Sequence, residues 1–143
     1  GLHGAIDDLI AFWTARAPGL EFDLEIPESS FGPRIDAALQ ALIGESVSNA
    51  MKHARPTRLA ISIATVGRAV KLEVRDDGGG FNKVRSIDGG YGILGMKERA
   101  QNLGGTLSVF EARGGRGVTV RASLPLSNSA AAEVEAAAEA LAS

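Results

Sequence analysis

The amino-acid sequence predicts an α+β fold: a two-layer sandwich in which about three helices cover one face of a mixed sheet of about five strands. Segments with helical periodicity interrupt shorter segments in which apolar and polar residues alternate, in the order α, β, α, β, β, α, β, β. Adjacent alternating segments pair as hairpins, which argues against an array of parallel strands joined by helices. The alternation leaves one sheet face polar, so helices are needed on the other face only.

The first three elements follow from periodicity and from the prolines that interrupt it. Apolar residues recur at helical spacing over 5–16, and Pro18 ends that helix. Residues 20–26 alternate between apolar and acidic side chains, which predicts a half-buried strand. After a loop, a long helix is predicted over 34–53, with Pro56 just beyond its end.

The remaining elements are shorter. Two alternating segments, at 59–63 and 70–74, lie on either side of a turn and predict a hairpin. A helix over 93–103 follows a glycine-rich stretch and ends at a pair of glycines. Two further strands, at 106–112 and 117–124, complete the predicted sheet.

Length and composition indicate one domain with a real core, which we place at 1–126. The Ala/Glu-rich tail, 127–143, is expected to be disordered or a frayed helix. No cysteine is present, which excludes disulfides and thiolate metal sites and fits a reducing compartment. Because the chain begins at Gly1 without a methionine, we expect it to be part of a longer protein.

The net charge of −2 is unevenly distributed. Residues 1–30 and the tail are acidic, so the central segment carries the positive charge. A modestly basic centre suits an anionic small ligand such as a nucleotide, and it is too dilute and too poor in aromatic residues to indicate nucleic-acid binding. No uncharged apolar run is long enough to span a membrane.

Three polar residues form a stripe on the long predicted helix. Glu45, Asn49 and Lys52 are separated by four and then three residues, which places them within about 60° of one another. The apolar residues of this helix fall on a neighbouring face, so one side can pack into the core. A carboxylate, an amide oxygen and a cation in a row suit a magnesium-bound phosphate and its attacking group. The alternative is an ordinary polar face with a lysine near the helix end.

A glycine-rich turn follows the strand at 70–74. Asp76 ends that strand, and a carboxylate there can accept hydrogen bonds from an exocyclic amine such as that of adenine. Gly78 and Gly80 allow the backbone to approach a flat ring or to adopt positive φ. The alternative is a plain Asp-Gly turn, which is common.

A second glycine-rich segment, 90–96, opens the last predicted helix. Its spacing from Gly90 to Gly95 superficially matches a dinucleotide-binding fingerprint, but no strand precedes it, so we reject that interpretation. A helix N-terminus with small residues exposes amide donors to phosphate. The polar segment 82–89 before it is a candidate mobile cover over a nucleotide, and an ordinary solvated loop is the alternative.

The two histidines do not form a metal site. His3 is expected in an irregular, exposed N-terminal stretch. His53 lies at the end of the long helix, where a cation is favourable to the helix dipole. This capping role and a direct contact with a ligand both remain open. Since no Ser/His/Asp order or Gly-x-Ser-x-Gly motif is present, nucleophilic hydrolysis has no support.

Three segments together resemble the boxes of the GHKL nucleotide-binding family, the ATPase superfamily of gyrase, the large ATP-dependent chaperones, mismatch-repair ATPases and histidine kinases. The segment that resembles the asparagine box is Glu45…Asn49…Lys52-His53-Ala54. The segment that resembles the first glycine box is Asp76-Asp77-Gly78-Gly79-Gly80-Phe81. The segment that resembles the second glycine box is Gly90-Tyr91-Gly92-Ile93-Leu94-Gly95-Met96 with Lys97-Glu98-Arg99-Ala100. The residues within these boxes are most similar to those of sensor histidine kinases of the nitrate-sensor and desaturase-sensor type. The resemblance covers about 5–126 and implies the Bergerat ATP-binding fold.

The resemblance implies that the domain binds ATP or ADP with Mg²⁺. Glu45 would be catalytic, orienting or deprotonating the attacking imidazole or a water. Asn49 would ligate the Mg²⁺ that bridges the phosphates, Lys52 would contact phosphate, and Asp76 would accept from the adenine amine. The other nucleotide-binding positions that the boxes imply are His53, Gly78, Gly80, Gly90, Gly92, Ile93, Gly95 and Met96.

Two departures from the family pattern matter. Family members often carry a threonine directly after the last glycine of the final box, where it helps to hold adenine through water. Here Val118 follows Gly117, and Thr119 comes one residue later as a weaker candidate. The phosphoacceptor histidine of such kinases lies on an upstream dimerisation domain, and His3 lacks the expected flanking residues.

The leading hypothesis is therefore the cytoplasmic ATP-binding catalytic domain of a two-component sensor histidine kinase. The resemblance implies transfer of the ATP γ-phosphoryl to a histidine on the dimerisation domain and then to the receiver domain of a response regulator. The isolated domain would be a monomer without autophosphorylation, and the parent kinase would be a homodimer, either membrane-anchored or soluble. The alternatives are a stand-alone GHKL serine kinase of the anti-sigma type and a non-catalytic nucleotide-sensing module.

Overall fold

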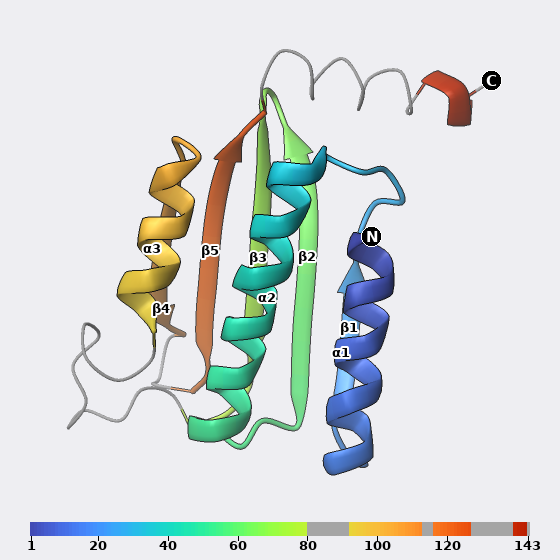
Figure 1. Ribbon diagram of the computed structural model, residues 1–143. Helices are drawn as coiled ribbons and strands as arrows, with labels where there is room; N and C mark the ends of the chain where they lie inside the picture. The colour runs from blue at the N-terminus through green and yellow to red at the C-terminus, as the bar shows by residue number, and fades with distance from the viewer. Residues whose placement is uncertain (80–91, 113–115, 127–138, 143) are drawn as a thin grey trace.

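The computed structural model describes residues 1–79, 92–112, 116–126 and 139–142. Its elements are α1 (Leu2–Arg16), β1 (Glu21–Glu25), α2 (Pro33–His53), β2 (Arg58–Val66), β3 (Ala69–Asp76), α3 (Ile93–Asn102), β4 (Thr106–Glu111) and β5 (Val118–Pro125). The three helices lie on one face of the five-stranded sheet (Figure 1). The predicted α+β sandwich is thus confirmed, element by element.

The sheet is mixed, with strand order β1-β2-β3-β5-β4. β1 pairs with β2 in parallel, whereas the other three pairs are antiparallel. The parallel pair needs a crossover connection, and α2 provides it. Because β5 lies between β3 and β4, the last strand in the chain occupies an interior position in the sheet, and β4 is at its edge.

The hydrophobic core lies between the helices and the sheet. Burial of each large apolar side chain there contributes about 1.5–3 kcal/mol. The core residues supplied by the three central strands are Leu59, Ile61, Ile63, Val70, Leu72, Val74, Val120, Ala122 and Leu124. The opposite sheet face is polar, as predicted: Glu73 forms ion pairs with Arg75 at 3.3 Å and with Arg121 at 3.1 Å.

The central helix α2 is anchored at its start by a side-chain carboxylate. Asp36, in its first turn, accepts hydrogen bonds from the Ser30 hydroxyl at 2.6 Å and from the Phe31 backbone N–H at 2.9 Å. These bonds hold the chain that enters the helix. One face of α2 is then buried along its whole length, through Ile35, Ala38, Leu39, Leu42, Ile43, Ser46, Val47 and Ala50.

The N-terminal elements differ from the prediction in three respects. α1 begins at Leu2, so His3 lies in a helix and its ring Nε2 is 2.7 Å from the Pro27 carbonyl oxygen, although it is exposed as expected. Burial of Leu2 outweighs the low helix propensity of the neighbouring glycines. Leu24 is 42% exposed, so β1 is less buried than its alternation indicated, because it is an edge strand.

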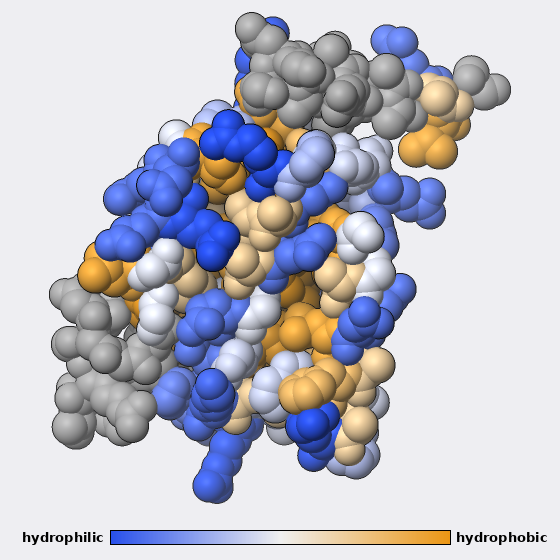
Figure 2. Space-filling model, viewed as in Figure 1, coloured by the Kyte–Doolittle hydropathy of each residue, from blue (hydrophilic) through white to orange (hydrophobic). Residues whose placement is uncertain are grey.

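The helix-covered side of the molecule is mostly hydrophilic, with apolar residues gathered over α1 (Figure 2). On that helix Phe12 is 46% exposed, and the Arg16 guanidinium lies 3.5 Å from its ring centroid. Among the described residues, no helix is both long and apolar enough to cross a membrane. Of the tail, the structure describes only a short exposed helical stretch at 139–142, so its order and the domain boundary at 126 stay predictions.

Candidate functional site

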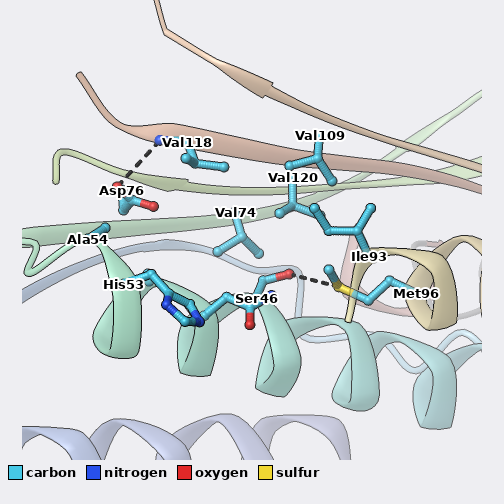
Figure 3. A pocket seen from close by; sticks show the side chains of 12 residues that line it. Ser46, His53, Ala54, Val74, Asp76, Ile93, Met96, Val109, Val118 and Val120 are labelled. Atoms are coloured by element: carbon cyan, nitrogen blue, oxygen red, sulfur yellow. Dashed lines mark hydrogen bonds between the residues drawn. The ribbon is translucent and has the colours of Figure 1, made fainter. Parts of the chain in front are cut away.

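A pocket opens at the end of the sandwich where the C-terminal ends of α2 and β3 meet the N-terminal ends of α3 and β5 (Figure 1). Its volume is about 430 Å³, counting the part open to solvent. Apolar side chains form most of the wall, and a few polar groups converge on it (Figure 3). The lining residues are Ser46, Asn49, Ala50, His53, Ala54, Val74, Asp76, Ile93, Met96, Val109, Val118 and Val120.

Asp76 is the acidic group of this pocket. Its Oδ1 accepts hydrogen bonds from the backbone N–H of Gly78 at 2.9 Å and of Val118 at 3.4 Å (Figure 3). Burial raises the pKa of this carboxyl above its ordinary value, the two N–H donors oppose that rise, and the charge of Asp77 adds to it. An ionised Asp76 is therefore under-solvated, and a ligand that donates a hydrogen bond to it would relieve that cost.

Two glycines allow the backbone to close around Asp76. A Cβ on Gly78 would overlap the Ala54 carbonyl oxygen at the end of α2. Gly117 has φ +84°, and a Cβ there would overlap the Asp76 carbonyl oxygen. The Gly117 N–H also donates to the Gly78 carbonyl at 2.8 Å. These positions require glycine because α2, β3 and β5 approach one another at backbone distance.

The stripe on α2 meets the start of α3 at Glu45. Gly92, the N-cap of α3, has φ +63°, and a Cβ on it would lie 2.5 Å from Glu45 Oε1. Glu45 is exposed, and Asn49, one turn further along α2, lines the pocket. The helix thus presents an amide inside the pocket and a carboxylate near its rim, beside the N-terminus of the next helix.

The structure brings together five of the predicted site residues as pocket lining: Asn49, His53, Asp76, Ile93 and Met96. Gly78 contributes through its backbone, and Lys52 is exposed and does not line the pocket. The predicted positions Gly80 and Gly90, and the segment 82–89, lie outside the described residues.

Two predicted positions lie away from the pocket. Gly95 is on the other side of α3, in a groove shared with the first half of α2. Thr119 is buried, but it pairs with Arg75 on β3 and with Phe110 on β4. Because side chains alternate along a strand, Thr119 occupies the opposite face from its two valine neighbours, which line the pocket. The one-residue shift relative to the family pattern therefore turns this side chain away from the pocket.

Most of the apolar wall was not predicted from the sequence. Ser46 is not among the predicted site residues, yet it lines the pocket, with its hydroxyl donating to the Leu42 carbonyl at 2.6 Å. The same oxygen lies 3.6 Å from Met96 Sδ, which links α2 to α3 (Figure 3). The alternating pattern around Val74, Val118 and Val120 predicts that they lie on strands. Whether they meet in one pocket depends on which strands pair, and β3 pairs with β5.

The donor set limits how a metal could be held. Within the parts of the chain that the structure describes, no cluster of three or more His, Asp or Glu side chains could bind a metal ion. A Mg²⁺ at this pocket would therefore take most of its ligands from phosphates and water, which is its usual mode in nucleotide sites. The Asn49 amide oxygen fits as a protein ligand of that kind.

Known proteins match this chain in sequence and in fold. The family model described as "Histidine kinase-, DNA gyrase B-, and HSP90-like ATPase" matches residues 35–128. The nitrate/nitrite sensor protein NarQ of Escherichia coli (strain K12) is 35% identical over 97 residues, which are 67% of this chain and 17% of NarQ. The histidine-protein kinase/phosphatase DegS of Bacillus subtilis (strain 168) is 31% identical over 106 residues, 72% of this chain and 27% of DegS.

A solved structure gives the same fold. The histidine kinase domain of the Erythrobacter litoralis EL346 blue-light activated histidine kinase superposes with a TM-score of 0.72 at 22% identity, covering 92% of this chain and 62% of that one. The chain spans less than a third of the length of NarQ or DegS. The matched residues 35–128 include all but the first two residues of α2, together with Asp76 and α3, which border the pocket. This chain therefore belongs to the family of histidine kinase-, DNA gyrase B- and HSP90-like ATPases.

Proposed function

We propose that this chain is the ATP-binding catalytic domain of a sensor histidine kinase, and that the whole protein transfers the γ-phosphoryl group of ATP to a histidine. The observation that carries the proposal is the position of Asp76, held by two backbone N–H donors in a mostly apolar pocket. The matched kinases support the same reading.

The apolar end of the pocket suits the adenine ring. Val74, Val118 and Val120 offer flat apolar surface from the sheet, and Ile93 and Met96 offer it from α3. Asp76 would accept a hydrogen bond from the exocyclic amine, which would compensate for the burial that raises its pKa. A guanine presents an oxygen at that position, which the carboxylate would repel. The site should therefore prefer adenine nucleotides.

The α2 stripe suits the phosphate end. Asn49 would hold a Mg²⁺ shared with the phosphates, and the ion would supply neutralisation of their charge. Lys52, which is exposed two turns beyond Glu45, would reach phosphate from outside the pocket. Glu45 would orient or deprotonate the accepting imidazole from the rim.

The acceptor histidine would come from a dimerisation domain of the same kinase. His3 is unsuited to that role, because its ring Nε2 lies 2.7 Å from the Pro27 carbonyl oxygen and neither residue lines the pocket. The chain alone should therefore bind nucleotide without phosphorylating itself. The receiver domain of a response regulator would take the phosphoryl group from the dimerisation domain of the homodimeric parent kinase.

Calorimetric titration with ADP and ATP, with and without Mg²⁺, tests the nucleotide site. We expect binding that prefers ADP over IDP, which carries a carbonyl oxygen in place of the adenine amine, and we expect Asp76→Asn to abolish that preference. A folded protein that binds neither nucleotide would refute the proposal and favour a module that has lost nucleotide binding.

The catalytic assignment needs a longer protein that includes the dimerisation domain. Glu45→Gln should retain nucleotide affinity and lose autophosphorylation by about a hundredfold or more, as expected for a group acting only in the transition state. Unchanged autophosphorylation would show that Glu45 has no catalytic role. Phosphorylation of serine on a separate protein would favour the stand-alone kinase of the anti-sigma type.

A further inference from the structure

A second acidic residue, Asp77, follows Asp76 and accepts hydrogen bonds from a different part of the chain. Its Oδ1 accepts hydrogen bonds from the backbone N–H of Thr57 at 2.8 Å and of Arg58 at 2.9 Å. Its Oδ2 accepts a hydrogen bond from the Thr57 hydroxyl. Asp77 is exposed, so solvent alone could have satisfied its charge. Instead, three donors from one short connection converge on it.

That connection joins the end of α2 to the start of β2, and its first residues belong to the pocket wall. His53 and Ala54 line the pocket from this side, and Asp76 lines it from the end of β3. A backbone hydrogen bond from Gly79 N–H to the Ala54 carbonyl, at 2.9 Å, links the same two segments as the Asp77 contacts. The turn after β3 is thus tied to the end of α2 at two neighbouring points.

The opposite side of the same turn is tied to β5. Gly117 N–H donates to the Gly78 carbonyl, and Val118 N–H donates to Asp76 Oδ1. The side chain of Asp76 therefore sits between two anchors: one to β5 through its own oxygen, and one to the α2–β2 connection through Asp77. Loss of the second anchor would let the turn rotate about the first.

We propose that Asp77 is a positioning residue of the nucleotide site, which orients the Asp76 carboxylate toward the base by holding the α2–β2 connection against the turn after β3. This inference rests on the proposed function, because it assigns Asp76 to adenine recognition. Asp77 itself does not line the pocket, so it acts through Asp76 and through the connection that it holds.

The shift in the pKa of Asp77 favours the ionised form of its carboxyl. Although some burial opposes it, the hydrogen bonds from Thr57 and Arg58 lower the pKa of Asp77 below its ordinary value. The neighbouring carboxyl, Asp76, is shifted in the other direction. Because the pKa of Asp77 is lowered from 3.8, its carboxyl is ionised at neutral pH, and its hydrogen bonds are charge-assisted.

The test compares the affinities of the full chain for ADP and IDP by calorimetry, in wild type and in Asp77→Ala and Asp77→Asn. Asp77→Ala should lower the ADP affinity by about tenfold and leave the IDP affinity nearly unchanged, so that the preference for ADP falls. Asp77→Asn keeps an acceptor for Thr57 N–H and Arg58 N–H, and it should retain most of the preference.

Asp36→Ala is the matched control, because Asp36, at the other end of α2, likewise accepts a hydroxyl and a backbone N–H, although it has one N–H donor where Asp77 has two. It should lower stability without changing the ADP/IDP ratio. If Asp77→Ala fails to fold, Thr57→Val removes only the hydroxyl bond and should lower the ratio by about threefold.

The outcomes separate this inference from the proposed function. A wild-type protein that shows no preference for ADP would refute the role of Asp76, and the inference with it. A wild-type preference that survives in Asp77→Ala, or in Thr57→Val when the former does not fold, would overturn the inference alone. Equal losses for ADP and IDP would also overturn it, because they would indicate a general structural role.

Discussion

Gly117→Ala should destabilise the fold and damage the pocket together. An L-residue at φ +84° costs about 1–2 kcal/mol relative to glycine. The new Cβ would overlap the Asp76 carbonyl oxygen, so the chain must shift and lose the Gly117 N–H bond to Gly78, a further loss of about 1 kcal/mol. We expect the free energy of unfolding to fall by about 2–3 kcal/mol in total, and ADP affinity to fall because Val118, the next residue, donates to Asp76.

Gly67→Ala provides the matched comparison for that substitution. Gly67 lies in the β2–β3 turn with φ +61°, and no atom lies within 4 Å of the Cβ that alanine would add. It should therefore lose only the conformational part, about 1–2 kcal/mol, and keep its ADP affinity. Urea unfolding of both variants, with calorimetry on the folded proteins, gives the two readouts. Equal destabilisation, or full ADP affinity in Gly117→Ala, would refute the argument from close backbone approach.

Other substitutions test the core and the charge of the site. Leu42→Ala, at a side chain with 0% exposure in α2, should lower the free energy of unfolding by about 2–5 kcal/mol in urea. Asp76→Asn should change the pH dependence of stability. Because the folded-state pKa of Asp76 is raised from 3.8, the stability associated with its protonated form is complete below that value and is lost as pH rises through the raised pKa. Relative to wild type, Asp76→Asn should therefore gain stability as pH rises from 3.8 through the raised pKa of Asp76, measured by urea unfolding at a series of pH values; a parallel pH profile would contradict it.

The fold could be predicted because its signals are local. Alternation in β2 and β3 and the periodicity of α2 each depend on neighbouring residues, and the structure confirms them. The start of α1 could not be predicted, because glycines near Leu2 disfavour a helix and only tertiary burial of Leu2 compensates.

The site was predictable where a functional group lies on a motif. Asn49 and Asp76 follow from helical spacing and from a strand end, and both line the pocket. The valine walls follow from the pairing of β3 with β5, which joins strands distant in sequence and which no local pattern specifies. The same register explains Thr119, since a shift of one residue moves a strand side chain to the other face.

Because β1 and β2 are parallel, the connection between them must cross over the sheet, and α2 forms that connection. The Arg58–Glu21 contact across that pair joins residues 37 apart, whereas the β2–β3 hairpin closes locally. If the edge strand β1 separated from β2, the chain before α2 would be released from the sheet, while the end of α2 remained connected to β2. Nucleotide bound at the far end of α2 should therefore slow amide hydrogen exchange in β1, a strand that contributes no side chain to the pocket.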